Sequence, residues 1–438
     1  MSEAAVYAVA GHPVLHSRSP EIFEAGFRAA GISAVYTRLA ARNAEEIKLL
    51  ADALDLKGVN ITSPFKETVI PFLDELHPTA QAIGAVNVVI RKNGRLIGDN
   101  TDHLGAVNAL AARGVDLPRR RALVIGAGGA ARAAVFGLLR KGCRVTVVNR
   151  TAAKAEAIAK RMGCLWKPPD GMEDAVRDSE IIVSCRSVPE RAFDPVCLRR
   201  GHVVLDARYQ GSQLVDDAAD RAGIAVSGRD WLLHQAAAGF GLMTGVSYPV
   251  GELENALARE APAHPEKAIA LIGFMGSGKS SLANLLAHKL KRRHMDSDDM
   301  IESATGLSVP EIFARSGEAE FRAIEKKVVC SLDFAPGSVF SLGGGAVLDP
   351  EIRSIIKAKT LSFWIYADPG TTAERVRPGS RPLLEGKSAA GGIGALFRSR
   401  IPAYAATADA VVVNNGRPGD LETAAKRIED EIRQSLRS

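Results

Sequence analysis

The chain has 438 residues, a length that corresponds to about two to four domains. Hydrophobic residues make up 46% and charged residues 24% of the sequence, which excludes a disordered chain, a collagen-like repeat and a disulfide scaffold. The 56 basic and 50 acidic side chains leave a net charge of +6, which suits anionic small substrates and is too dilute to indicate nucleic-acid binding.

The cysteines and the N-terminus indicate a cytoplasmic protein. The five cysteines are scattered and form no CxxC pair, a pattern typical of reduced thiols. The first residues have no basic region, and the apolar stretch Ala4–Ala10 is too short for a secretory signal. The longest apolar run, Ala122–Leu139, contains Arg132 and a glycine turn, so we expect a strand, a turn and a buried helix there, and no membrane span.

Apolar runs alternate with helical stretches along the chain, which predicts an α/β fold with parallel sheets. The expected strands of the first part are Val6–Ala10, Val86–Ile90, Ala122–Ile125, Val145–Val148, Ile181–Val183 and Val203–Leu205, with a helix at Ala152–Met162. A second series is expected after a charged, proline-containing linker: strands Ile269–Ile272, Val339–Leu342 and Leu361–Tyr366, and a helix at Lys279–Leu290.

A glycine-rich loop follows the strand that ends at Ile125. Its sequence from Gly126 to Ala131 is GxGxxA, a dinucleotide-binding pattern in which the helix N-terminus faces the pyrophosphate. At the end of the next strand, where NAD sites usually place an acid, the chain has Arg150. A cation there favours the 2′-phosphate of NADP. The predicted cofactor residues are Gly126, Gly128, Gly129, Ala130, Asn149, Arg150, Thr151 and Lys154.

Four polar clusters precede this loop, at residues 16–20, 60–66, 84–87 and 98–102. In the first cluster, Ser17 and Ser19 could converge on one anionic group. The second ends with Lys66, and the fourth contains Asp102. Taken singly, each cluster is typical of a turn or a solvated face.

Together, the ordered motifs GHPVLHSRSP, GVNITSPFK, AIGAVN, GDNTD, GAGGAARA, NRT and WLLHQA resemble the shikimate dehydrogenase family over residues 5–255. The resemblance implies that Lys66 and Asp102 form the catalytic pair, with hydride supplied by the cofactor. It implies substrate contacts from Ser17, Ser19, Thr62, Asn87, Tyr209 and Gln235.

A second glycine loop, from Gly273 to Ser280, matches GxxxxGK[ST] between a strand and a helix. In this P-loop pattern, backbone N–H groups hold phosphates, Lys279 reaches the β- and γ-oxygens, and Ser280 binds Mg²⁺. Asp296 and Asp298 follow, and in an extended segment both carboxylates would point to one side. The predicted nucleotide residues are Gly276, Ser277, Gly278, Lys279, Ser280 and Ser281.

The motifs GFMGSGKSS, DSDDMIE, GEAEFRAIE, SLGGGAV, SRPLL and RIPAY resemble shikimate kinase over about residues 268–430. The resemblance implies that Asp298 acts on the attacking hydroxyl and that Asp296 supports Mg²⁺. It implies that Arg381 covers the phosphates and that Arg375 stacks on adenine. The implied shikimate contacts include Arg322, Gly344, Gly345 and Arg400.

We therefore predict a bifunctional enzyme of aromatic amino acid biosynthesis that reduces 3-dehydroshikimate with NADPH and phosphorylates shikimate with ATP and Mg²⁺. The expected domains are an α/β substrate domain at 1–105, completed by 235–257, a Rossmann NADP-binding domain at 106–234, a linker at 258–267 and a P-loop kinase domain with a parallel sheet at 268–438. The expected partners are the small-molecule substrates, with no nucleic acid and no membrane, and a homo-oligomer is kept open.

Two other functions stay open at this point. One is a quinate/shikimate dehydrogenase that uses NAD, fused to the kinase; Arg150 and the Ser17–Ser19 pair argue against it. The other is a pathway sensor built from inactive domains. The presence of Lys66 and Lys279 argues against it.

Overall fold

The computed structural model describes residues 4–186, 188, 190–209, 211–248, 250–258, 267–375, 392–416 and 419–435. The chain forms two compact units. Unit 1 contains Met1–Pro20, Ser33–Ser63 and Glu260–Ser438, and unit 2 contains Glu21–Ile32 and Pro64–Arg259. The predicted domain boundaries at 105/106 and 234/235 fall inside two helices, α4 and α9, and the domain limits stay a prediction beside this division. Most of the predicted linker, residues 259–266, lies outside the described residues.

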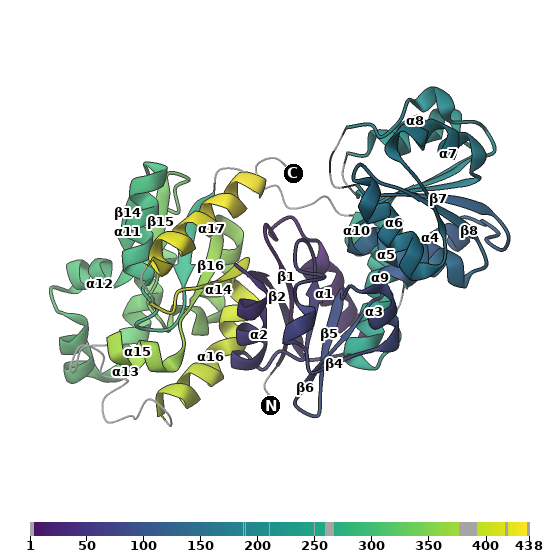
Figure 1. Ribbon diagram of the computed structural model, residues 1–438. Helices are drawn as coiled ribbons and strands as arrows, with labels where there is room; N and C mark the ends of the chain where they lie inside the picture. The colour runs from purple at the N-terminus through teal and green to yellow at the C-terminus, as the bar shows by residue number, and fades with distance from the viewer. Residues whose placement is uncertain are drawn as a thin grey trace. The chain divides into compact units, whose positions relative to one another are not determined.

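Unit 1 combines the first strands of the chain with its C-terminal part (Figure 1). Its described elements are β1 (Ala5–Gly11), β2 (Ala34–Ala40), α2 (Ala44–Ala53), β3 (Gly58–Ile61), β13 (Ala268–Ile272), α11 (Lys279–Leu290), β14 (Arg293–Asp296), α12 (Ser297–Thr305), α13 (Val309–Cys330), β15 (Ser338–Ser341), η4 (Ala346–Leu348), α14 (Pro350–Lys359), β16 (Thr360–Tyr366), α15 (Pro369–Arg375), α16 (Gly394–Thr407), β17 (Ala410–Val413) and α17 (Asp420–Ser435).

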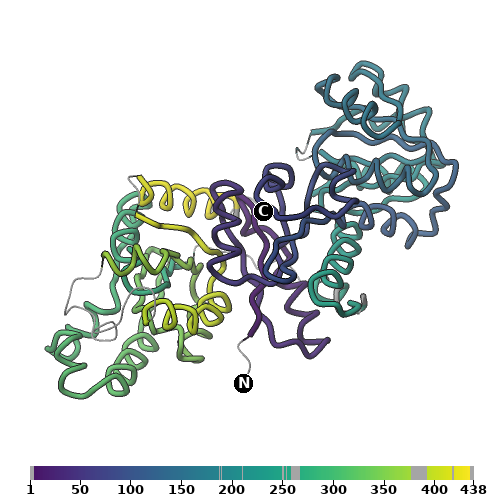
Figure 2. The backbone as a smooth tube through the Cα atoms, turned by 60° about the horizontal axis from the view of Figure 1, so that its bottom comes forward, coloured from purple at the N-terminus to yellow at the C-terminus, as the bar shows by residue number. Residues whose placement is uncertain are grey.

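The strands of unit 1 form one parallel sheet in the order β14-β15-β13-β16-β17-β2-β1-β3. Every residue of β13 and β16 is buried, as expected for a parallel sheet covered on both faces. The sheet passes from the C-terminal part of the chain to the N-terminal part where Val411 of β17 pairs with Leu39 of β2. Figure 2 shows the C-terminal helices in yellow beside these first, purple strands.

Unit 2 contains the rest of the first part of the chain. Its described elements are α1 (Ser19–Ala30, from Glu21 on), η1 (Ile70–Phe72), β4 (Glu75–Leu76), α3 (Pro78–Ile83), β5 (Val88–Lys92), β6 (Arg95–Asp99), α4 (Asp102–Ala112), β7 (Arg121–Ile125), α5 (Gly129–Arg140), β8 (Arg144–Val148), α6 (Ala152–Met162), β9 (Leu165–Lys167), η2 (Pro169–Gly171), α7 (Met172–Asp178), β10 (Ile181–Ser184), η3 (Pro195–Cys197), β11 (Val203–Asp206), α8 (Gln213–Arg221), β12 (Ile224–Val226), α9 (Gly228–Thr244) and α10 (Val250–Ala258).

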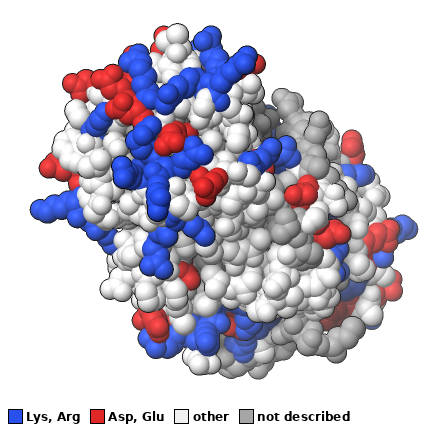
Figure 3. Space-filling model, turned by 90° about the vertical axis from the view of Figure 1, so that its right-hand side faces the viewer, with Lys and Arg blue, Asp and Glu red and all other residues white. Residues whose placement is uncertain are grey.

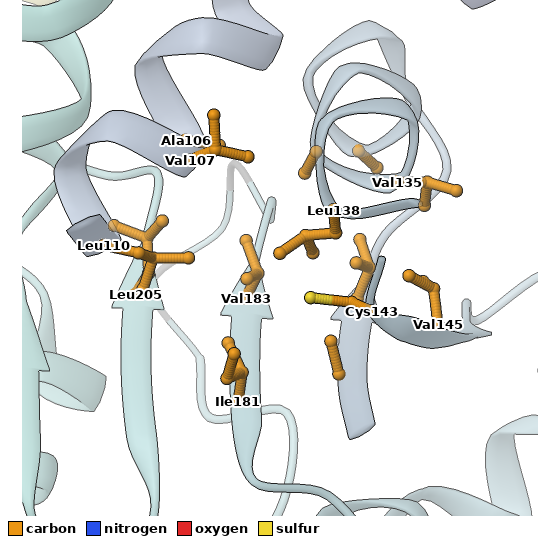
Figure 4. Packing of buried hydrophobic residues seen from close by; sticks show 14 of the residues in the cluster. Ala106, Val107, Leu110, Val135, Leu138, Cys143, Val145, Ile181, Val183 and Leu205 are labelled. Carbon is orange, nitrogen blue, oxygen red and sulfur yellow. The ribbon is translucent and has the colours of Figure 1, made fainter. Parts of the chain in front are cut away.

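The larger sheet of unit 2 is parallel throughout, in the order β12-β11-β10-β7-β8-β9. Helices α4 and α5 cover one face, where Leu110 and Leu138 pack with Val183 and Leu205 of the strands (Figure 4). This is the predicted Rossmann-like arrangement, and the α/β fold class is confirmed. Strands β5, β6 and β4 lie next to one another, with β5 antiparallel to β6.

The apolar run Ala122–Leu139 divides into β7, a glycine turn and α5, as predicted. Among the described residues, no helix is long and apolar enough to cross a membrane.

Candidate active sites

Lys66 and Asp102 form an ion pair in unit 2, with 2.5 Å between Nζ and Oδ2. Lys66 lies in the turn after β3, and Asp102 is the first residue of α4. Asp102 is buried, whereas Lys66 is partly exposed. The pair therefore holds an ammonium group at the surface of a buried carboxylate, where the ammonium can donate a proton to a bound molecule.

An amide network fixes the orientation of Asp102. The Asn87 side-chain N–H group donates to Asp102 Oδ1 at 2.9 Å and to Gln235 Oε1 of α9 at 3.0 Å. The side-chain oxygen Oδ1 of Asn87 accepts from the backbone N–H of Thr101 at 2.7 Å. Four of the predicted residues, Lys66, Asn87, Asp102 and Gln235, thus lie together. Thr101 was not predicted; its position within the GDNTD motif was the available signal.

The predicted dinucleotide loop lies against this cluster. Gly126 has φ 126° and faces the Cys185 carbonyl, with 3.2 Å between that oxygen and a Cβ built at Gly126. A Cβ built at Gly129 would lie 3.4 Å from the Lys66 Cβ. Gly128 caps α5 and has no side chain that could accept from the first N–H groups of the helix, so the cap leaves these donors available to an anion. Burial raises the pKa of the neighbouring Cys185 thiol, and the carboxylates of Asp206 and Asp102 act in the same direction.

An open cleft of about 900 Å³ begins at this loop. Arg150 and Lys154 line it, as predicted, together with Gly128, Asn149 and Thr151. Two further cations, Arg132 and Arg161, also line the cleft and were not predicted. Arg132 is on the first turn of α5, directly after the glycine motif, and this position in the sequence could have identified it as a cofactor residue. The donor set suits a ligand that has both a pyrophosphate and a further phosphate.

The remaining predicted substrate residues are divided between the units. Ser17 and Ser19, in unit 1, are buried and hydrogen-bonded to each other at 3.2 Å. Thr62, also in unit 1, is half-buried after β3. Tyr209, in unit 2, lies in the loop after β11 and is half-buried. The substrate roles of these residues stay predictions.

The second glycine loop, in unit 1, requires glycine at several positions. Gly273 has φ 142°, and a side chain there would collide with the Ile365 carbonyl of β16. Gly276 and Gly278 have φ 79° and 85°, which ordinary residues seldom adopt. Lys279 begins α11, and its ammonium group donates to the Phe274 carbonyl at 2.9 Å. The chain therefore curls around the space in which a P-loop holds phosphates.

Ser280 and Asp296 meet beside this loop. The hydroxyls of Ser280 and Ser341 each donate to Asp296 Oδ2 at 2.7 Å. Burial would raise the pKa of Asp296, but the hydrogen bonds from Ser341, Ser280 and the Asp298 N–H group, together with the charge of Lys279, outweigh it, so the pKa lies below its ordinary value. An ionised carboxylate next to a serine hydroxyl fits the coordination of Mg²⁺.

The expectation that Asp296 and Asp298 share an extended segment was wrong. Asp296 ends β14 and caps α12, accepting the backbone N–H of Asp298 at 2.9 Å. Asp298 is therefore in the first turn of a helix. The reason is that an aspartate before a helical sequence satisfies the free N–H groups of that helix. Both carboxylates still line one cavity.

That cavity, of about 580 Å³, lies beside the P-loop. Asp298, Arg322, Gly344 and Gly345 line it as predicted. A side chain at Gly345 would collide with the Arg322 guanidinium. Glu325 was not predicted: it is buried one turn after Arg322 and accepts from its Nη1 at 2.5 Å. Burial raises the pKa of Glu325, and the Arg322 charge opposes that shift.

The other predicted cations are placed as follows. Arg400 is buried on α16 and donates to the Gly344 carbonyl at 3.0 Å. Arg375 donates to the carbonyls of Gly276 and Asn414 at 3.3 and 3.2 Å, so its guanidinium lies against the P-loop. Arg381 lies outside the described residues. The predicted nucleotide residues Ser277 and Ser281 are buried and exposed, respectively.

Three family models match the chain. They are described as shikimate dehydrogenase substrate binding domain, at residues 9–89, shikimate/quinate 5-dehydrogenase, at residues 109–209, and shikimate kinase, at residues 275–434. The first two matches contain Lys66 and the dinucleotide loop, and the third contains most of the P-loop and the acids beside it.

Individual relatives match the part of the chain that contains Lys66, Asp102 and the dinucleotide loop. A shikimate dehydrogenase (NADP(+)) of Methanothrix thermoacetophila is 38% identical over 260 residues, which cover 58% of this chain and 96% of the relative. The crystal structure of shikimate 5-dehydrogenase from Thermus thermophilus with NADP(H) and shikimate has 32% identity and a TM-score of 0.53, covering 58% of this chain and 98% of that one. Quinate dehydrogenase from Corynebacterium glutamicum with NAD has 26% identity and a TM-score of 0.54, covering 58% and 99%.

Proposed function

Because the chain belongs to the shikimate dehydrogenase family and has a shikimate kinase domain in its C-terminal part, we propose that it reduces 3-dehydroshikimate with NADPH and phosphorylates the shikimate formed with ATP. The product of the first reaction is the substrate of the second. The observation that supports this most directly is the presence in one chain of a Lys66–Asp102 pair beside a dinucleotide loop and of a P-loop with the Ser280–Asp296 pair.

In the reduction, Lys66 is the proton donor. The dinucleotide loop and Arg150 would hold NADPH, which would supply the hydride for the carbonyl carbon of the substrate. The Lys66 ammonium donates a proton to the carbonyl oxygen as negative charge develops there, which gives the hydroxyl of shikimate. Asp102 keeps the ammonium in place, and Asn87 keeps Asp102 in place. Lys66 then takes a proton from water.

NADP fits the cofactor cleft better than NAD. Arg150 and Lys154 lie where an NAD site would need an acid for the ribose hydroxyls, and both line the cleft. A guanidinium can bind a 2′-phosphate through two hydrogen bonds. This argues against the NAD-dependent quinate/shikimate alternative, although the quinate dehydrogenase shares the fold.

In the phosphorylation, the residues around the P-loop neutralise charge and orient the hydroxyl. The N–H groups of the loop and Lys279 bind the phosphates of ATP, and Ser280 with Asp296 would hold Mg²⁺, which neutralises phosphate charge when bound. Asp298 accepts a hydrogen bond from the attacking hydroxyl and aims it at the γ-phosphorus. Arg322, fixed by Glu325, binds the substrate carboxylate.

The partners are the small molecules of these two reactions. All five cysteines are free thiols, which supports placement in the cytoplasm. On the face drawn in Figure 3, Lys and Arg side chains lie among Asp and Glu side chains.

A coupled assay with the full-length protein tests the proposal. With 3-dehydroshikimate, NADPH, ATP and Mg²⁺, we expect NADPH oxidation followed by ADP release and formation of shikimate 3-phosphate; without ATP, shikimate accumulates. Faster turnover with quinate and NAD would support the alternative dehydrogenase. A protein that binds shikimate and turns over neither substrate would be the inactive sensor.

A further inference from the structure

The last helix of the chain reaches the segment that contains the two predicted substrate hydroxyls. Glu431 of α17 is fully buried. Its carboxylate accepts the backbone N–H of Val14 at 2.8 and 3.0 Å, and that of Leu15 at 2.9 Å. All these residues belong to unit 1, and α17 lies beside the N-terminal segment in both views (Figures 1 and 2).

The acceptor is needed because Val14 and Leu15 are themselves buried. Buried backbone N–H groups that lose their partner cost free energy, and a carboxylate is a stronger acceptor than a neutral group. A tight turn follows, in which the Ser17 N–H group donates to the Val14 carbonyl at 2.9 Å. The position of the Val14 backbone therefore determines the position of the Ser17 backbone.

The other end of the same segment is held by Arg38 of β2. Its Nη2 and Nε donate to the Ser17 carbonyl at 2.8 and 3.2 Å. The segment Val14–Ser17 is thus held at Val14 and Leu15 by Glu431 and at the Ser17 carbonyl by Arg38. Ser19 follows two residues later, and its hydroxyl lies 3.2 Å from that of Ser17, so a shift of the Ser17 backbone would separate or misalign the two hydroxyls.

The docking of α17 is specified by a second buried charge on the same helix face. Arg427, one turn before Glu431, is buried and pairs with Glu46 of α2 at 2.6 Å. It also donates to the Ala40 carbonyl at the end of β2 at 3.1 Å. Residues at i and i+4 lie on one face of a helix, and here both have partners among the first 46 residues of the chain; Arg427 also donates to the Val413 carbonyl of β17 at 2.9 Å.

We propose that Glu431, in the kinase half, is a positioning residue for the dehydrogenase reaction: its carboxylate holds the backbone that presents Ser17 and Ser19 to 3-dehydroshikimate. This inference rests on the proposed function of those two hydroxyls. It makes the substrate affinity of the dehydrogenase dependent on a residue that takes no part in the kinase reaction.

The test compares three variants in the full-length protein. Glu431→Ala removes the acceptor, and we expect the KM for 3-dehydroshikimate to rise about ten-fold, since two buried donors lose their partner. The KM for NADPH and the kinase kcat/KM should stay within about two-fold of wild type. Glu431→Gln retains one carbonyl oxygen that can accept both N–H groups, so it should restore most of the affinity. Glu422→Ala is the control, because Glu422 is an exposed residue of the same helix that pairs with Lys289 of the kinase half.

An unchanged KM for 3-dehydroshikimate in a folded Glu431→Ala protein would overturn the inference. So would equal losses in both activities, which indicate a docking role only. If the alanine variant does not fold, Glu431→Asp, which keeps the charge but withdraws it by one methylene, decides between the same two outcomes. A wild-type protein that does not reduce 3-dehydroshikimate would overturn the proposed function as well, whereas wild-type activity with an indifferent Glu431 would overturn this inference alone.

Discussion

The two glycine loops of this chain begin alike and end differently. Each opens with a glycine at positive φ, Gly126 at 126° and Gly273 at 142°, set against a carbonyl of a neighbouring segment. In the dinucleotide loop, the chain then extends through Gly128 and enters α5 without a charged side chain in the loop. In the P-loop, the chain curls back, and Lys279 is the first residue of the helix.

The difference reflects where each reaction takes place. A dinucleotide loop binds a pyrophosphate that does not react, so backbone N–H groups are sufficient, and Lys66, which we propose as the proton donor, lies outside the loop. A P-loop surrounds the phosphate chain whose last group is transferred, so it needs its own cation. The same local signal, glycines between a strand and a helix, thus serves binding in one loop and catalysis in the other.

The largest expected effect is that replacing one of the two lysines abolishes one reaction and leaves the other unchanged. Lys66→Ala should lower the reduction rate by about 10²–10⁴-fold, the usual contribution of a general acid, and leave phosphorylation of added shikimate unchanged. Lys279→Ala should do the opposite. Initial rates of NADPH oxidation and ADP release on each variant measure this. If one variant abolishes both reactions while its circular dichroism spectrum is unchanged, the assignment of the two lysines to two separate reactions is wrong.

The acids beside the P-loop sharpen the kinase half of the comparison. Asp298→Asn should reduce kcat by about 10²-fold through misplacement of the attacking hydroxyl and weaken shikimate binding, with ATP binding kept. Asp296→Asn should instead raise the Mg²⁺ concentration required, because Asp296 is the carboxylate beside Ser280. Titrations with Mg²⁺ and with shikimate distinguish them. Rescue of the Asp298 variant by Mg²⁺, without rescue of the Asp296 variant, would reverse the two roles.

The choice between NADPH and NADH tests the role of Arg150, which lies outside the glycine loop. Arg150→Ala should weaken NADPH binding by about 1.5–3 kcal/mol, the contribution of a charge-assisted contact, and leave NADH binding nearly unchanged. KM values for both cofactors measure the effect. Lys160→Ala is the matched control, since Lys160 is an exposed cation on the neighbouring helix α6. Equal weakening of NADPH and NADH would contradict the role of Arg150.

The first glycine of each loop should tolerate alanine to different degrees. At Gly273 a Cβ collides with the Ile365 carbonyl, whereas at Gly126 it stands 3.2 Å from the Cys185 carbonyl oxygen. Strained backbone costs about 1–3 kcal/mol per residue, and we expect Gly273→Ala to be the costlier change. Thermal unfolding and nucleotide KM values test this ranking; a more damaging Gly126→Ala would show that the two openings are not equivalent.

The smallest effect concerns acid stability. The pKa of Asp296 is lowered in the folded protein, so its ionised form stabilises the fold above its ordinary pKa of 3.8, and this contribution is lost as the pH falls through the lower folded value. Asp296→Asn should therefore make stability depend less on pH below about pH 4. Denaturant unfolding of both proteins at several acidic pH values measures the slope. Identical slopes would mean that the hydrogen bonds to Asp296 do not favour its ionised form.

Much of the fold around both loops could be predicted from the sequence. The strand, loop and helix at Arg121–Arg140 and at Ala268–Leu290 agree with the predicted elements to within one residue, because apolar runs next to glycines are strong local signals. Asp298 was wrongly expected in an extended segment, because the pattern of alternating acids ignores the helix cap that Asp296 forms.

Other site features have no local signal. Glu325 matters only because Arg322 and Gly343 lie against it, and the role of Glu431 depends on a contact with Val14, 417 positions away in the sequence. Such contacts are set by packing of distant segments, which neither periodicity nor a motif records.

The pairing of β17 with β2 has a consequence for how the chain can be divided. Each of these strands would be the outermost strand of its own half, and their residues are mostly buried in unit 1. An outermost strand offers unpaired N–H and C=O groups that recruit strands from other molecules. In this chain β17 and β2 pair at Val411 and Leu39, which shields part of the open side of each strand. Cutting the chain at the predicted linker would expose both strand edges, and we expect each separated half to aggregate more readily than the intact protein.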